Sequence, residues 1–212
     1  MLVKRRAPSR GFSLIELAVA LTVLGLLVLV VAPPVSDWVR NLRVRGATEA
    51  IQAGLQRARG EALRTNELVT FWFVSGSNAT VVDNSCALSS SSGSWVVSRV
   101  DPTGACGAEP STTVDPRIVQ THAAGQTSAG VTISAVAADG TNASCVRFNG
   151  FGRVVDSTAG PDDDCRPPKQ VTRIDVTHAL GARSLRILVA TGGGIRMCDP
   201  AVTDATDPRR CP

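Results

Sequence analysis

The sequence predicts an α+β protein in which one long N-terminal helix precedes a region of short β-strands. Residues 12–35 form an almost uninterrupted apolar run, and from there to residue 66 apolar residues recur every three to five positions, a helical spacing. Residues 67–212 instead alternate short β-branched and aromatic runs with stretches rich in Ser, Gly, Asp and Pro. With 212 residues, 43% hydrophobic and 19% charged, the chain suits one domain with an appendage and is too apolar for a disordered protein.

The apolar run 12–35 is long enough to cross a membrane. Its 24 residues span roughly 36 Å as a helix, at about 1.5 Å per residue. A basic cluster precedes it and predicts a cytoplasmic N-terminus, with the rest of the chain across the membrane: Lys4, Arg5, Arg6 and Arg10. The single charge within the run is Glu16. A carboxylate inside a membrane helix costs about 2.5–3.5 kcal/mol on insertion scales and therefore indicates a functional residue.

Two simpler interpretations of this segment stay open. A secretory signal peptide would be cut after Ala32, but Pro33 directly after the cut disfavours cleavage, and the run is long for a signal core. A plain transmembrane anchor is the second alternative, and it leaves Glu16 unexplained.

Residues 36–66 predict an amphipathic continuation of the same helix, loosened at Pro33-Pro34 and at Gly46. The apolar stripe consists of Trp38, Leu42, Ala47, Ile51, Leu55, Ala58 and Ala62. Six arginines lie mostly on the other side: Arg40, Arg43, Arg45, Arg57, Arg59 and Arg64. We expect this arginine face to be solvated or to contact another subunit, rather than to bind DNA.

Six strands are expected after the helix, at residues 68–74, 95–100, 131–136, 145–155, 171–176 and 184–190. The acidic run Asp162, Asp163 and Asp164 is expected to be a solvated turn. Calcium binding there is the alternative, but the run lacks the alternate-position spacing of calcium loops.

The net charge of +4 comes from the N-terminus. Without its four basic residues the chain has 18 basic and 18 acidic residues, and from Glu67 onward it has 12 basic and 14 acidic. This balance argues against nucleic-acid binding through the overall charge of the chain, although it does not exclude a local basic patch.

The cysteines predict disulfides rather than a metal site. None forms a C-x-x-C pair, and His122 and His178 have no ligand-like spacing, so we expect no metal and no cofactor. An even number of cysteines after a membrane segment is typical of an oxidising compartment. Of the fifteen connectivities, sequence order suggests Cys86–Cys106, Cys145–Cys165 and Cys198–Cys211.

The residues around the start of the apolar run resemble the processing site of type IV prepilins. The segment reads Arg10-Gly11-Phe12-Ser13-Leu14-Ile15-Glu16. In that family a cytoplasm-facing prepilin peptidase cuts after the glycine and methylates the new amino terminus. The resemblance implies that Gly11 ends the leader, that Phe12 becomes N-methyl-phenylalanine and that Glu16 is the assembly carboxylate.

Three further stretches resemble the GspH/FimT minor pseudopilins. They are residues 55–66, which match a helix-end pattern except that Gly60 replaces a serine, residues 147–154, which match a hairpin pattern, and the closing segment 185–189 with 193–198. Residues 75–140 match nothing in that family. In an unrelated protein these glycines would be ordinary turn residues.

The resemblance implies a pilin-like fold, with the N-terminal helix packed on a head of antiparallel β-sheets. The parts would be a leader (1–11), a transmembrane segment (12–35), the second half of the helix (36–66) and a periplasmic head (67–212). It also implies a minor pseudopilin of the type II secretion system in the inner membrane, a structural subunit of the periplasmic pseudopilus that drives protein export across the outer membrane. The implied partners are major and minor pseudopilins, prepilin peptidase, the inner-membrane secretion platform and membrane lipid.

Two alternatives to export remain. A FimT-like minor pilin of a type IV pilus would bind DNA through a Gly-Arg-x-Arg motif; here only Arg196 of its two arginines is present, and Arg209 and Arg210 could substitute. A periplasmic enzyme on a membrane anchor would make Gly11 and Glu16 coincidental. No catalytic constellation or phosphate-binding glycine loop is evident, so we do not expect an enzyme.

Overall fold

The structure is a computed structural model that describes residues 12–125, 129–155, 165, 170–181 and 183–212, with the backbone alone for residues 28–34. The chain divides after Val39 into two compact units. Within the part of the chain that the structure describes, no helix is both long and apolar enough to cross a membrane.

Helix α1 runs over Leu14–Thr65, and its ends follow from its terminal residues. At the start, the Ser13 carbonyl accepts a hydrogen bond from the Leu17 amide at 3.1 Å, and Ser13 with Glu16 forms the S-x-x-E pattern of a capping box. At the end, Asn66 takes a left-handed conformation with φ 55°, as asparagine often does just beyond a helix. The first part of α1 belongs to one unit and residues 40–65 to the other.

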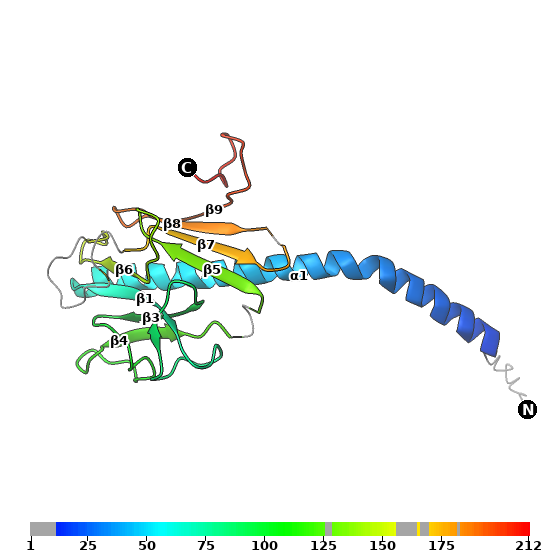
Figure 1. Cartoon of the computed structure of the whole chain (residues 1–212), viewed down its shortest axis with the longest axis horizontal. Helices are drawn as coiled ribbons and strands as arrows, with labels where there is room; N and C mark the ends of the chain where they lie inside the picture. The colour runs from blue at the N-terminus through cyan, green and yellow to red at the C-terminus, as the bar shows by residue number, and fades with distance from the viewer. Residues whose placement is uncertain (1–11, 126–128, 156–164, 166–169, 182) are drawn as a thin grey trace, which may run out of the picture. The chain divides into compact units, whose positions relative to one another are not determined.

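The second unit contains a five-stranded antiparallel sheet, of which β1, β3, β4 and β6 are labelled in Figure 1. β1 (Val69–Ser75) is central, and β3 (Ser94–Ser98) and then β4 (Ile118–His122) lie on one side of it. On its other side, β6 (Cys145–Phe148) pairs with the first half of β1 and β2 (Ala87–Leu88) with its end.

A four-stranded antiparallel sheet completes the head. Its order is β5 (Val131–Val136), β7 (Arg173–His178), β8 (Leu185–Val189) and β9 (Ile195–Cys198). The strands alternate buried and more exposed positions, because one face of this sheet packs into the core.

The main core joins residues 40–65 of α1 to both sheets. Leu55 and Ala58 of the helix, Phe71 and Trp95 of the five-stranded sheet and Ile174 of the other sheet belong to one buried cluster. The other face of the five-stranded sheet is also buried, in a second cluster that includes Trp72 of β1. Burial on both faces explains why β1 reads as a continuous apolar run instead of an alternating one.

Three disulfides each link a cysteine to the next cysteine along the chain: Cys86–Cys106, Cys145–Cys165 and Cys198–Cys211. This is the pairing that sequence order suggests. The first two contribute their sulfurs to the second core cluster, so they form part of the cover over the outer face of the five-stranded sheet. The third ties the C-terminal tail to the end of β9.

Several strands differ from those expected from the sequence. The strand expected at 145–155 ends at Phe148, because the chain turns at Asn149 and reaches a left-handed Gly152 (φ 71°). The strand expected at 95–100 ends at Ser98, whose hydroxyl donates to the Val100 carbonyl at 2.6 Å. β2 and β4 are not expected from the sequence, because neither has a long enough apolar pattern. The closing segment 193–198 contains a separate strand, β9.

Candidate assembly site

The N-terminal segment presents a continuous apolar surface. Phe12 and Leu14 are each 86% exposed, and the other large apolar side chains up to Leu27 are also exposed. Such a surface on a single chain exceeds what a soluble monomer leaves bare, so lipid or protein must cover it. Gly11, the predicted end of the leader, lies outside the described residues.

Glu16 lies in the first turn of α1 and is exposed. A carboxylate near a helix N-terminus is favoured by the helix dipole. Once the surrounding apolar surface is covered, however, this charge loses its water, and burying it unpaired is expensive. A cation from another molecule or from the chain's own amino terminus would offset this cost.

Three stretches that resemble a pilin-like family meet at one place, the C-terminal end of α1. The Arg59 Nε donates to the Gly152 carbonyl at 3.0 Å, joining the helix to the turn after β6. A side chain at Gly150 would overlap Asn66, and one at Gly193 would overlap the Gly152 carbonyl. Both Gly152 (φ 71°) and Gly193 (φ 82°) have left-handed backbones, so these glycines are required by packing and conformation.

Most arginines of the α1 face form hydrogen bonds or ion pairs within the chain. Arg40 and Arg43 donate to the Leu180 and Ala129 carbonyls at 3.3 and 3.4 Å. Arg45 pairs with Glu49 at 2.7 Å, Arg59 binds Gly152, and Arg64 pairs with Glu61 at 2.6 Å. Arg57 is exposed and makes no hydrogen bond or ion pair with any described residue. The sequence does not distinguish Arg57 from the other five.

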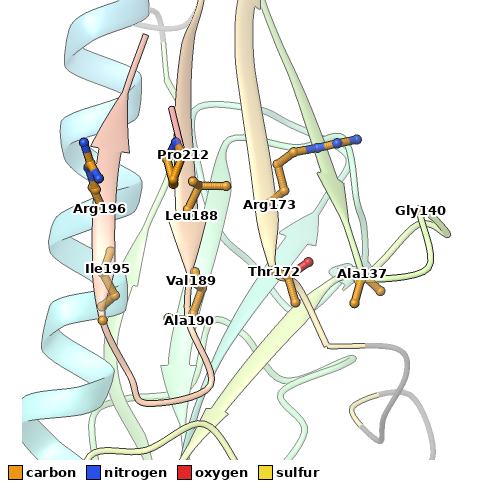
Figure 2. A pocket seen from close by; sticks show the side chains of 12 residues that line it. Ala137, Gly140, Thr172, Arg173, Leu188, Val189, Ala190, Ile195, Arg196 and Pro212 are labelled. Carbon is orange, nitrogen blue, oxygen red and sulfur yellow. The ribbon is translucent and has the colours of Figure 1, made fainter. Parts of the chain in front are cut away.

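The C-terminal arginines are also engaged. Figure 2 shows Arg196 of β9, Leu188 of β8 and Arg173 of β7 on neighbouring strands, lining a pocket of about 590 Å³ with Pro212. These three residues are in register. Arg196 donates to the Pro208 and Arg210 carbonyls at 2.9 and 3.0 Å, so its guanidinium holds the C-terminal tail.

Arg209 is neutralised locally. Its Nη2 lies 2.6 Å from Asp207 Oδ2, and its Nε also donates to that carboxylate. Hydrogen bonds from the Arg209 side chain and backbone lower the pKa of Asp207 to about 2, so the carboxylate is charged at any physiological pH. Arg210 is exposed. The residues that could contact DNA therefore do not form a set of free guanidinium groups.

The predicted calcium ligands Asp162, Asp163 and Asp164 lie outside the described residues. Across the described parts of the chain, no group of three or more His, Cys, Asp or Glu side chains could hold a metal ion.

Two family models match the chain, one near its N-terminus and one over most of the remaining residues. Residues 6–32 match the prokaryotic N-terminal methylation motif, and residues 47–194, more than half of the chain, match the family described as type II transport protein GspH. No curated protein matches the sequence.

Among solved structures, the type IV minor pilin FimU of Pseudomonas aeruginosa (strain PAO1) is similar in two crystal forms. In space group P21 the identity is 15% and the TM-score 0.44, with 73% of this chain and 87% of FimU covered. In space group P65 the identity is 15% and the TM-score 0.40, with 72% and 90% covered. On the strength of its GspH match, the chain belongs to the GspH family of structural, pilin-like subunits.

Proposed function

We propose that the protein is a minor pseudopilin of the type II secretion system, a structural subunit of the periplasmic pseudopilus that drives protein export across the outer membrane. The observation that carries the proposal is the presence of a methylation motif and a GspH domain in one chain. Prepilin peptidase would cut after Gly11 and methylate Phe12. Residues 12–35 would then hold the protein in the inner membrane, with its head in the periplasm.

Glu16 is the residue that would direct assembly. Cleavage after Gly11 creates an ammonium group at Phe12, four residues before the carboxylate. In an apolar environment each charge alone is expensive, whereas a pair largely offsets the cost. The carboxylate of a subunit already in the fibre would therefore neutralise the ammonium of the next, which fixes the axial register between subunits.

The disulfides support a periplasmic head. All six cysteines are paired, and four of them are buried in the cluster that covers the outer face of the five-stranded sheet. Disulfides persist in the bacterial periplasm and are rare in the cytosol.

DNA binding is the less supported function. Arg196 holds the C-terminal tail through its Nη2 and Arg209 pairs with Asp207, so both guanidinium groups already have partners within the chain. The chain from Glu67 onward is also slightly acidic, with 12 basic and 14 acidic residues. A protein that binds DNA through several phosphates needs an uncompensated basic surface.

The export function is tested by the extracellular proteins of a strain that lacks this gene, compared with the same strain carrying the gene on a plasmid. We expect the mutant to lose secreted enzymes from the medium and to accumulate their folded forms in the periplasm, with both effects reversed by the plasmid. An unchanged medium would contradict the export function. Salt-sensitive binding of DNA by the purified full chain would then support the type IV pilus alternative.

A further inference from the structure

Arg57 lies at a pocket between α1 and the five-stranded sheet, which we name the Arg57 pocket. It has a volume of about 590 Å³ and is lined by Arg57, Glu61, Arg64, Arg99, Ser111 and Thr112, among others. Arg57, Glu61 and Arg64 project from successive turns of α1, because they are spaced four and three residues apart. Arg99 follows β3, and the two hydroxyl residues precede β4.

The charges of the pocket are already partly paired. Glu61 is 6% exposed and accepts two hydrogen bonds from Arg64, at 3.0 and 2.6 Å. These bonds lower the pKa of Glu61, and the charges of Arg64, Arg57 and Arg99 add to this effect, so the carboxylate is ionised. Arg99 forms an ion pair with Glu67. Arg57 is left as an exposed guanidinium without a hydrogen bond or ion pair to any described residue.

The pocket therefore carries an excess of positive charge and has further donors. Of its three guanidinium groups, that of Arg64 is paired with Glu61 and that of Arg99 with Glu67, so the charge of Arg57 is the excess. The hydroxyl groups of Ser111 and Thr112 are polar neighbours. Ile118 and Val119 add an apolar wall. A carboxylate side chain flanked by small or apolar residues complements such a lining in charge and in polarity.

We propose that the Arg57 pocket receives an acidic segment of a neighbouring pilin-like subunit, with Arg57 as the partner of its carboxylate. The proposal rests on the assembly of GspH-family subunits with other pilins, and not on the export function itself. It would give this face of the head a role in selecting the neighbour, because a segment without a carboxylate would leave Arg57 unpaired at the interface.

A nucleic acid fits this pocket less well. The other arginines of the α1 face are engaged within the molecule, so Arg57 is not part of a basic stripe that could follow a phosphate backbone.

Photo-crosslinking in the full chain tests the proposal. A photoreactive benzoylphenylalanine is placed at Thr112, an exposed residue of the pocket lining, so that Arg57 stays in place. The control position is Gln56, which is exposed on α1 outside the pocket lining. Both proteins are expressed in the native host that lacks the chromosomal gene. We expect position 112 to crosslink to an Asp- or Glu-containing segment of another subunit that carries a methylation motif, and position 56 to give much less of this product.

Charge reversal then tests the pairing. Arg57→Glu should lower co-purification of that subunit from detergent-solubilised membranes by about fivefold or more, and a carboxylate-to-arginine change in the crosslinked segment should restore it. Arg57→Gln should give an intermediate loss. The control Arg153→Glu makes the same change of charge at an exposed arginine outside the pocket lining and should leave co-purification unchanged.

Several results would overturn the proposal: crosslinks to nucleic acid, to lipid or to a segment without carboxylates, or normal co-purification of an Arg57→Glu protein with wild-type thermal stability. Failure of the export function is distinguishable. In that case the secreted proteins stay unchanged when the gene is deleted, while the crosslink from position 112 to a pilin-like subunit persists.

Discussion

His122 stacks on Trp95, with ring centroids 5.2 Å apart and planes inclined by 18°. Burial lowers the pKa of this histidine, because the partly desolvated site disfavours its charged form. The unfolded chain, with a histidine pKa near 6.5, therefore binds a proton at a higher pH than the folded chain does. The contribution of His122 to stability is present above the unfolded pKa and is lost as the pH falls through the folded value.

We expect the melting temperature of the protein to decrease as the pH falls from 7.5 to 5, and His122→Phe to reduce this decrease. Phenylalanine keeps an aromatic ring against Trp95 but does not titrate. The measurement is thermal unfolding of both proteins at several pH values and constant ionic strength. An equal pH dependence in the two proteins would show that His122 does not couple stability to pH.

For single residues, the sequence shows an unusual residue type more readily than the contacts that a residue makes. Glu16 is conspicuous, because it is a lone charge in an apolar run. Arg57 and Arg59 look alike in the sequence, yet Arg59 binds the Gly152 carbonyl and Arg57 is unpaired among the described residues. The difference depends on turns far away in the chain, which no local pattern reveals.

Among the elements, α1 packs closely against the five-stranded sheet at one of its glycines. A Cβ atom at Gly54 would lie 2.7 Å from a ring atom of Phe71 and 2.8 Å from one of Trp95, both buried. Gly60, two turns later on the same helix, is exposed and has no atom within 4 Å of the same position. The two glycines therefore have opposite effects: one permits close packing, while the other only lowers helix propensity.

We predict that Gly54→Ala destabilises the protein by about 1 kcal/mol or more, because overpacking outweighs the gain in helix propensity. The matched variant Gly60→Ala should stabilise it by about 0.5–1 kcal/mol. Urea unfolding of the two variants and the wild type gives both values. Equal stability of Gly54→Ala and Gly60→Ala would show that a methyl group at position 54 does not overpack Phe71 and Trp95.

The elements with strong patterns are predictable and the short ones are not. The helix end expected at residue 66 lies one residue beyond the observed end at Thr65, and the strand expected at 131–136 coincides with β5. β2 has only two residues and exists because Val74 and Ser75 of β1 offer it an edge. Its formation depends on tertiary pairing and not on its own sequence.

For the whole molecule, the sequence predicts the α+β class and the antiparallel head follows from the family resemblance; both are confirmed. What the sequence does not predict is the meeting of α1, the turn after β6 and the β8–β9 hairpin at Arg59, Gly152 and Gly193. These contacts join residues about 40 to 130 positions apart, and only the fold brings them together.

Assembly into a fibre through the N-terminal segment is tested by Glu16→Ala in the full chain. Both this variant and the wild type are expressed in the host that lacks the gene, and two quantities are measured: the mass of the mature N-terminus and the amount of other pilin-like subunits that co-purify. Glu49→Ala is the control, since it removes one exposed, ion-paired carboxylate from the same helix.

We expect Glu16→Ala to be inserted, cut after Gly11 and methylated like the wild type, because processing precedes assembly. Its co-purification should fall by about tenfold, since the ammonium of a neighbouring subunit would be left without a partner in an apolar environment. Glu49→Ala should behave like the wild type. Normal co-purification of a correctly processed Glu16→Ala protein would show that assembly does not depend on the Glu16 carboxylate.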